Sequence, residues 1–222
     1  MTEQLPEDGD ARDLVKEIQK KKVQLNKEEG MKKEEKLPEI MEDEKPFEIP
    51  ENWCWVRLGN IADINPRNKI ADETQVSFIP MTLLKNGYST SFTFEKREWG
   101  DVKSSFTHFA DGDIVCAKIT PCFQNRKSAV MRELISGYGA GTTELHVIRP
   151  NDGFVLSDYL LYFLKTEYFI ANGMACMTGT AGQQRVGASY IQELLCPLPP
   201  YNEQKRIVTR LSEFLPLCDV LD

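Results

Sequence analysis

Amide, hydroxyl and cationic side chains crowd one short stretch of the chain, AKITPCFQNRKSAV at residues 117–130. β-like runs flank this stretch, so its polar residues fall at a turn between two strands. Arginine and lysine can bind phosphates or guanine edges, and asparagine and glutamine can pair with adenine. The residues at this turn that could contact DNA are Lys118, Thr120, Gln124, Asn125, Arg126 and Lys127. The alternative interpretation is an ordinary polar loop exposed to solvent.

Two further polar loops carry similar side chains, GAGTTE at residues 139–144 and TGTAGQQR at residues 178–185. Glycine in both loops permits a close approach of the backbone to a ligand. The donor side chains in these loops are Thr142, Thr143, Thr180, Gln183, Gln184 and Arg185. We expect the three loops to gather on one surface that fits a duplex groove, although the sequence alone does not establish that they converge.

Catalytic interpretations have weaker support. GYGAG at residues 137–141 resembles a nucleotide-binding glycine loop, but strand-like TTELHVIRP follows it where such a loop requires a helix. LPPY at residues 198–201 is similar to the Pro-Pro-Tyr motif of amino-methyltransferases, but Leu198 cannot hydrogen-bond an amine. No nucleophile comes with a plausible base. We therefore expect a non-catalytic protein that uses no cofactor.

The cysteines and histidines indicate no metal centre. His108 and His146 are the only histidines, and none of the six cysteines has C-x-x-C spacing. We expect reduced core thiols in a cytoplasmic protein. The N-terminus has no secretory signal, and the apolar run at residues 154–170 contains three charged residues, so we expect a buried helix there and no membrane span.

The charge is unevenly distributed. The formal net charge is −7, and residues 1–50 carry 10 Lys and Arg against 15 Asp and Glu. The remaining residues carry 17 basic against 19 acidic side chains. This near-neutral part leaves room for a local basic face, and its average charge neither shows nor excludes contact with DNA.

The first 52 residues predict a helix and a linker. Asp10 can cap a helix beginning at Ala11, and Gly30 can end it. Leu14, Ile18 and Leu25 form a narrow apolar stripe, which suits docking onto another helix; the alternative is a marginal solvated helix. A charged, proline-marked linker follows at residues 31–52.

The rest of the chain mixes short strands with helices. Strand-like runs occupy residues 76–84, 89–95, 112–119, 127–134 and 144–150. Helices are predicted from Ser157 through Tyr168, ending at Asn172-Gly173, then from Ala188 or Ser189, and finally from a cap at Asn202, with a kink or end at Pro216. Pro197, Pro199 and Pro200 predict an extended passage. The expected fold class is α+β, a curved mixed or antiparallel sheet with helices packed on it, flanked by projecting helical segments.

Three segments together carry a resemblance to a known family: KITPCFQNRKSA, GTTELHVIRP and TGTAGQQRVGASYIQELLCPLPPYNEQKRIV. They resemble the target recognition domain, and the helix that follows it, of type I restriction-modification specificity subunits. WCWVRLGNIADI at residues 53–64 matches the way those domains begin. The similarity covers about residues 47–222.

In that family, two recognition domains each read half of a split DNA target. Long helices pair as an antiparallel coiled coil, set the spacing of the two halves and bind the methyltransferase subunits. The resemblance implies that Thr180, Gln183 and Arg185 face DNA and that Asn202 begins a spacer helix. The implied partners are double-stranded DNA, the methyltransferase subunits, the restriction/translocase subunit and a second copy or another specificity subunit.

The resemblance also implies domain boundaries. Residues 1–30 resemble the end of a preceding repeat, 31–52 a charged linker, 53–200 the recognition domain and 201–222 the start of a truncated spacer helix. MTEQLPEDG resembles text that normally follows the first long helix, and LPLCDVLD falls early in the spacer helix. We therefore expect a half-subunit, a truncated gene or a fragment. The alternative function is an interaction scaffold or decoy that pairs through its helices with other specificity subunits.

Overall fold

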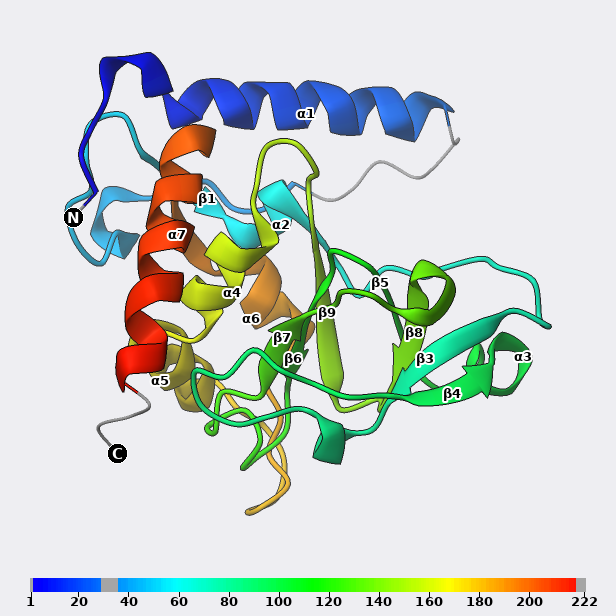
Figure 1. Cartoon of the computed structure of the whole chain (residues 1–222). Coiled ribbons are helices and arrows are strands. Elements are labelled where there is room, and N and C mark those ends of the chain that lie inside the picture. The colour runs from blue at the N-terminus through cyan, green and yellow to red at the C-terminus, as the bar shows by residue number, and fades with distance from the viewer. Residues whose placement is uncertain (1, 29–35, 219–222) are drawn as a thin grey trace. The chain divides into compact units, whose positions relative to one another are not determined.

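The computed structural model describes residues 2–28 and 36–218, with side chains omitted at residues 25–28 and 216–218. The chain divides into two compact units, each described here by itself. Unit 1 comprises Met1–Ala62, Asn151–Tyr159 and Ile191–Asp222, and unit 2 comprises Asp63–Pro150 and Leu160–Tyr190. The mixture of helices with antiparallel and mixed sheets confirms the predicted α+β class (Figure 1).

Unit 1 is built from both ends of the chain. Its elements are η1 (Pro6–Asp8), α1 (Ala11–Glu28), η2 (Glu42–Glu44), β1 (Cys54–Arg57), α2 (Leu58–Ile61), β10 (Leu195–Leu198) and α7 (Tyr201–Cys218). β1 and β10 pair antiparallel, with Trp55 opposite Pro197. The extended passage predicted at Pro197, Pro199 and Pro200 is therefore confirmed: Pro197 lies in β10, and the other two prolines link this strand to α7.

The predicted helix at the N-terminus is confirmed as α1. Asp10 precedes it, and an oxygen of its side chain accepts a hydrogen bond from the backbone N–H of Arg12 at 2.7 Å. On the predicted apolar stripe, Ile18 is fully buried and Leu14 is half-buried, and Ala11 at the start of the helix is also fully buried. The side chain of Leu25 and the predicted end at Gly30 lie outside the described part of the chain.

The segment between α1 and β1 is held down by a buried arginine where the structure describes it, from residue 36 onward. Arg57 donates hydrogen bonds to the carbonyl oxygens of Pro38, Glu39 and Glu193, and its guanidinium pairs with Glu44 at 2.8 Å. Its side chain is only 7% exposed. These bonds fix residues 38–44 against β1, although their composition predicts a linker.

Unit 2 contains two four-stranded sheets, in the orders β2-β9-β6-β7 and β4-β3-β8-β5. The strands are β2 (Ala62–Ile64), β3 (Gln75–Ile79), β4 (Glu95–Glu98), β5 (Thr107–Ala110), β6 (Ile114–Ala117), β7 (Ser128–Val130), β8 (Tyr138–Gly141) and β9 (Leu145–Pro150). Short helical turns accompany them at η3 (Met81–Leu83), α3 (Trp99–Val102) and η4 (Ile135–Gly137). β3 and β8 run parallel, whereas the pairs β3–β4, β5–β8, β6–β7 and β6–β9 are antiparallel.

The two sheets of unit 2 share a buried apolar core. Ile79 and Phe109 from one sheet pack in the same cluster as Val115, Ala129 and Val147 from the other. The side chains of these five residues are fully buried. The core therefore holds both sheets together and fixes the ends of the strands from which the polar loops leave.

Several predicted boundaries are wrong. The run at residues 89–95 contributes an isolated bridge between Leu84 and Phe92 and only its last residue to the strand β4, which begins at Glu95. GYGAG lies mainly in strand β8, because its glycines fit against a neighbouring aromatic ring. The backbone of α7 is helical through Cys218, so Pro216 does not end the helix, and the alternative of a kink at Pro216 stays a prediction.

The predicted helix from Ser157 is in fact two helices, α4 (Ser157–Leu164) and α5 (Glu167–Ala175). The break occurs because Thr166 caps α5, accepting a hydrogen bond from the backbone N–H of Phe169 at 3.3 Å. Gly173 does not end the helix but lies buried inside α5, where a Cβ atom would stand 2.4 Å from the ring of Phe123. The next helix, α6 (Ala188–Glu193), begins as predicted.

The cysteine prediction is confirmed only in part. Cys116 and Cys196 are buried free thiols, and Cys54 and Cys122 are half-buried. Cys176 is an exposed free thiol, so it is not a core residue. The side chain of Cys218 lies outside the described part of the chain.

Candidate nucleic-acid interface

The turn between β6 and β7 is tightly bonded within unit 2. At its base, the Ala117 N–H donates to the Lys127 carbonyl at 2.8 Å. At its tip, the Asn125 N–H donates to the Pro121 carbonyl at 3.0 Å. The buried ring of Phe123 anchors the turn against Phe169, with ring centroids 5.2 Å apart. These contacts fix the backbone that carries Gln124 and Asn125.

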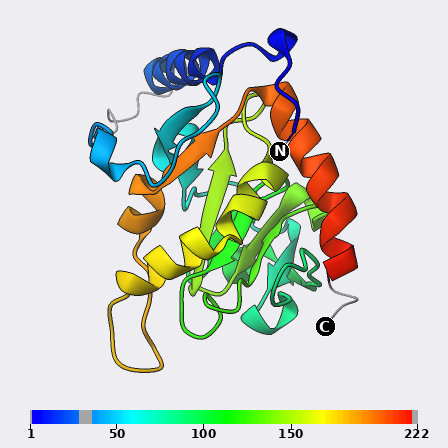
Figure 2. The same cartoon turned by 90° about the vertical axis from the view of Figure 1, so that its left-hand side faces the viewer.

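The loop between α5 and α6 is a hairpin. Thr178 and Arg185 exchange two backbone hydrogen bonds of 3.1 and 2.8 Å, and the Gln183 N–H donates to the Thr180 carbonyl at 2.9 Å. Gly182 has φ +78°, a backbone conformation that glycine adopts without strain. The side chains of Thr180 and Gln183 are exposed at this tip, which projects in the turned view (Figure 2).

Backbone hydrogen bonds bring the three predicted loops together. The Lys118 N–H donates to the Glu144 carbonyl at 2.9 Å, and the Val186 N–H donates to the Lys118 carbonyl at 2.9 Å. Thr120 and Gln184 are joined by a bond of 3.0 Å from the Thr120 N–H. Residues 118–120 therefore lie between the turn at 142–144 and the hairpin at 178–185, at one end of unit 2 (Figure 1).

A bidentate ion pair joins two of these loops. Nε and Nη2 of Arg185 donate to the two carboxylate oxygens of Glu144 at 2.9 and 2.8 Å. Nη1 donates to the Gln183 carbonyl at 2.8 Å. Arg185 holds the pKa of Glu144 below its usual value. The three bonds use three of the five guanidinium N–H groups, and the Arg185 side chain is 41% exposed. Arg185 can therefore stabilise the two loops and still donate a hydrogen bond to a ligand.

Arg126 has a different environment. Its Nε donates to the Lys165 carbonyl at 2.9 Å, and its Nη2 pairs with Glu167 at 2.5 Å. Its guanidinium also lies 5.5 Å from the ring centre of Tyr88. The side chain is 22% exposed, so these contacts with the protein account for most of its surface. Lys127 is also engaged, donating to the Met81 carbonyl at 2.9 Å.

The remaining predicted site residues differ in exposure. The side chains that point most openly to solvent are Asn125, Thr143, Thr180 and Gln183, and the half-buried ones are Lys118, Thr120, Gln124, Thr142 and Gln184. Thr142 shapes its turn, because its hydroxyl accepts a hydrogen bond from the Glu144 N–H at 3.2 Å. The exposed set offers amide and hydroxyl groups, the chemistry that reads base edges.

The glycines of the 139–144 segment have a packing role. A Cβ atom at Gly139 would stand 2.2 Å from the Phe109 ring and 2.6 Å from the Ser77 carbonyl oxygen. A Cβ atom at Gly141 would stand 2.7 Å from the Ile79 carbonyl oxygen. These glycines admit a close approach of the neighbouring strands and of Phe109, which replaces the predicted approach of a ligand.

Lys165 was missed by sequence reasoning. Its side chain is fully buried, and its ammonium donates to the carbonyl oxygens of Gly87, Ser89 and Arg126 at 2.9, 3.1 and 2.9 Å. Burial lowers the pKa of this lysine to about 8. The available signal was a charged residue in a strongly apolar helical run, directly before the helix-capping Thr166.

His146 is a second missed residue, and it anchors the hairpin at 178–185. One ring nitrogen, Nε2, lies 2.9 Å from the Val186 carbonyl oxygen, and Nδ1 lies 3.3 Å from the side-chain nitrogen of Asn65. Because the carbonyl only accepts and the amide nitrogen donates, we assign the proton to Nε2. Burial lowers the pKa of His146, which favours this neutral form.

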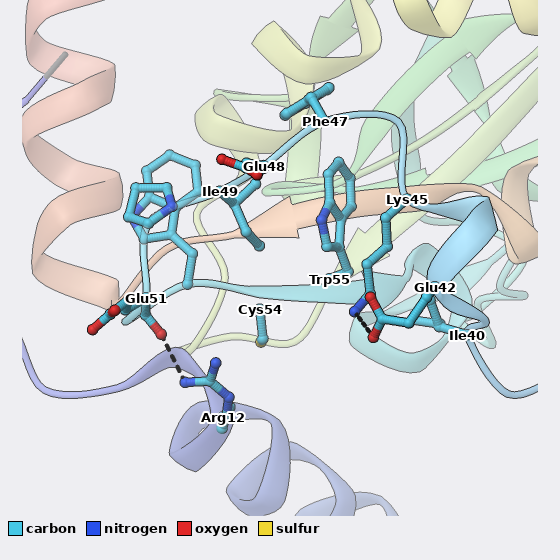
Figure 3. A pocket seen from close by; sticks show the side chains of 12 residues that line it. Arg12, Ile40, Glu42, Lys45, Phe47, Glu48, Ile49, Glu51, Cys54 and Trp55 are labelled. Atoms are coloured by element: carbon cyan, nitrogen blue, oxygen red, sulfur yellow. Dashed lines mark hydrogen bonds and ion pairs between the residues drawn. The ribbon is translucent and has the colours of Figure 1, made fainter.

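Unit 1 carries a separate hollow beside β1 (Figure 3). Phe47 and Trp55 meet edge to face there, with ring centroids 4.9 Å apart. Its cations are already engaged, since Lys45 pairs with Glu42 at 2.5 Å and Arg12 donates to the Glu51 carbonyl at 2.9 Å. Because these two cations are engaged with the protein, the hollow attracts phosphates weakly. We therefore place the candidate interface in unit 2.

Within residues 2–28 and 36–218, no group of three or more His, Cys, Asp or Glu side chains could hold a metal ion. No helix in the same part of the chain is long and apolar enough to cross a membrane.

Comparison with known proteins identifies similar sequences. Residues 50–219 match the family described as type I restriction modification DNA specificity domain. The chain is 46% identical over 218 residues to the type I restriction enzyme EcoAI specificity subunit of Escherichia coli and 44% identical to the EcoEI specificity subunit. Each alignment covers 98% of this chain and 37% of the relative, so the chain spans little more than a third of their length.

Solved structures share the fold. The HsdS subunit from Thermoanaerobacter tengcongensis superposes with a TM-score of 0.65 at 20% identity, covering 80% of this chain and 46% of that one. A chain from a study of complex assembly and conformational transition of the type I R-M system gives a TM-score of 0.55 at 18% identity, covering 95% and 46%.

Proposed function

Because the chain belongs to the type I restriction modification DNA specificity domain family, we propose that it recognises a specific DNA sequence and catalyses no reaction itself. In this proposal it binds one half-site of a split target in double-stranded DNA. It directs methyltransferase and restriction subunits to that half-site and needs no cofactor of its own. The recognition domain corresponds to residues 53–200, and the helix from residue 201 is the spacer.

One observation carries this proposal, which is the convergence of the three polar loops in unit 2. The bonds from Lys118 to Glu144 and from Val186 to Lys118 align them, and the Arg185–Glu144 pair joins two of them. A rigid backbone lowers the entropic cost of binding, because the exposed amides are already positioned. Asn125 and Gln183 are the side chains best suited to pair with adenine.

The experiment is a selection from random-sequence duplexes by the full chain assembled with its methyltransferase partner. We expect enrichment of one half-site motif. Gln183→Ala should relax the preference at one base position, with a loss of about 1–3 kcal/mol of discrimination. Lys118→Ala should weaken binding to all sequences and lower the salt dependence of the affinity.

A matched control is Lys96→Ala, which removes an exposed lysine from β4 in the same unit. It should leave both the motif and the salt dependence unchanged. Selection of no motif by the wild-type assembly, or the same motif and affinity after both Gln183→Ala and Lys118→Ala, would contradict the proposed interface.

A second candidate function is an interaction scaffold or decoy, and an apolar groove in unit 1 favours it. The groove is lined by Phe47, Trp53, Ile207, Leu211 and Phe214, and Phe214 is 51% exposed on α7. Such a helix face suits pairing with a helix of a second copy or of another specificity subunit. Size-exclusion chromatography with a full-length subunit shows whether the two chains form a complex. The selection from random-sequence duplexes then separates the two functions, since a decoy forms the complex but confers no DNA preference.

A further inference from the structure

A fourth polar tip, residues 85–91, lies in unit 2 outside the three predicted loops. It closes a short hairpin, in which the Thr93 N–H donates to the Leu83 carbonyl at 3.2 Å and the Lys85 N–H donates to the Ser91 carbonyl at 3.3 Å. Gly87 has φ +66°, so the Asn86-Gly87 pair makes the turn without strain. The side chains of Lys85, Asn86 and Tyr88 are exposed.

This tip is bonded to the turn of the 117–127 loop. The Gly87 N–H donates to the Asn125 carbonyl at 2.8 Å. Tyr88 lies beside the guanidinium of Arg126, 5.5 Å from the ring centre to the central carbon. The fourth tip therefore lies directly beside Asn125, one of the exposed amides of the candidate interface.

A buried cation locks the two tips together. The Lys165 ammonium donates to two carbonyls of the fourth tip, Gly87 and Ser89, and to the Arg126 carbonyl of the neighbouring turn. Burying a charged group is costly unless its hydrogen bonds are satisfied, and here three carbonyls satisfy it. A surface loop with no binding role gains little from being fixed at that cost, which indicates that the position of this tip matters for function.

We propose that residues 85–91 form a fourth DNA-contacting element, in which Asn86 reads a base edge and Lys85 holds a phosphate, while Lys165 is a positioning residue. The inference rests on the proposed function and extends its interface from three loops to four. An amide can pair bidentately with adenine, and an ammonium supplies a point charge to a phosphate. Asn86 precedes Gly87, whose N–H donates to the Asn125 carbonyl, so the two exposed amides lie on neighbouring tips.

The test uses the full chain assembled with its methyltransferase partner and a library of random-sequence duplexes. Asn86→Ala should lower discrimination at one base position by about 5- to 150-fold. Lys85→Ala should weaken binding to all sequences alike and reduce the slope of log affinity against log salt by about 1. Lys96→Ala again serves as the matched charge control and should change neither quantity.

The positioning role of Lys165 has its own readout. Lys165→Met retains the length of the side chain but cannot bond the three carbonyls. We expect its selected motif to lose the base position assigned to Asn86 and to keep the position that depends on Gln183. A uniform loss at all positions would assign Lys165 a merely structural role and overturn this part of the proposal.

The outcomes separate the inference from the function on which it rests. If the wild-type assembly selects no motif, both are overturned. If the wild type selects a motif that depends on Gln183, but Asn86→Ala and Lys85→Ala retain the motif, the affinity and the salt slope, the fourth element is overturned and the proposed function stands. Unchanged midpoints of thermal unfolding for Asn86→Ala and Lys85→Ala confirm that the comparison is made between folded proteins.

Discussion

Gly139→Ala provides a sharp test of how unit 2 is built. Gly139 lies in β8 opposite Ser77 of the parallel strand β3. An added Cβ atom would meet the Phe109 ring at 2.2 Å and the Ser77 carbonyl oxygen at 2.6 Å. The ring is fully buried in the core shared by the two sheets, and the carbonyl belongs to a paired strand. Neither neighbour can move without disturbing the sheet or the core.

The expected magnitude follows from two opposing effects. Overpacking a well-packed core costs about 1–3 kcal/mol, and two close contacts place this substitution at the upper end. Replacing glycine by alanine also restricts the unfolded chain, which returns about 0.4–1 kcal/mol. We therefore expect a net loss of about 2 kcal/mol in the free energy of unfolding. For a chain of this size, that loss lowers the melting temperature by roughly 4–8 °C.

The assay is urea unfolding followed by circular dichroism, with Gly187→Ala as the matched control. Gly187 is exposed, and a Cβ atom there would meet only the Ser189 hydroxyl at an ordinary 3.5 Å. The control should change stability by less than about 0.5 kcal/mol. Unchanged stability of Gly139→Ala, combined with weaker DNA binding, would refute the packing explanation and restore the interpretation of this glycine as a site of ligand approach.

Three further predictions concern buried polar groups. The folded-state pKa of Lys165 is about 8, below its ordinary 10.5, so its titration leaves the free energy of unfolding unchanged below pH 8 and raises it as the pH increases from 8 toward 10.5. Urea titrations should show the wild type gaining about 2 kcal/mol relative to Lys165→Met between pH 7 and pH 10, and an equal pH dependence of the two proteins would contradict the lowered pKa. Burial lowers the pKa of His146, so the stability that its neutral form contributes is present above the ordinary pKa of 6.5 and is lost as the pH falls. In urea titrations the wild type should lose more stability than His146→Gln between pH 7 and pH 5, and equal losses would contradict the assignment of a neutral ring. Arg57→Met should release residues 38–44, because three carbonyls and Glu44 lose their partner. Cleavage by a glutamate-specific protease at Glu39 and Glu42 should accelerate roughly tenfold or more, and unchanged cleavage would show that the segment is held by other contacts.

The sequence predicted the features that local chemistry controls. Asp10 before an amphipathic run specifies the start of α1, and the prolines at 197–200 specify an extended segment before α7. The polar loops were also recognisable, since amides, threonines and glycines mark turns regardless of what packs around them. Motif combinations across residues 47–222 were enough to indicate the family.

The sequence did not reveal which side chains of those loops are engaged with the protein. Arg126 and Arg185 looked alike as exposed cations, yet Arg126 is largely covered by Lys165, Glu167 and Tyr88, whereas Arg185 stays 41% exposed. The difference arises from segments 38 to 41 residues away in the chain. Local composition carries no information about such distant partners.

Local sequence by itself determined the helix starts at Ala11, Ser157 and Ala188, because capping acts over a few residues, but it did not predict the start of α5 at Glu167. Tertiary structure alone decided that Lys165 is buried among three carbonyls, that Gly139 makes room for Phe109, and that the tip at residues 85–91 is bonded to the turn of the 117–127 loop. Each of these outcomes depends on contacts between segments distant in the chain. Such contacts are selected by the packing of the two sheets around their common core, which no short stretch of sequence encodes.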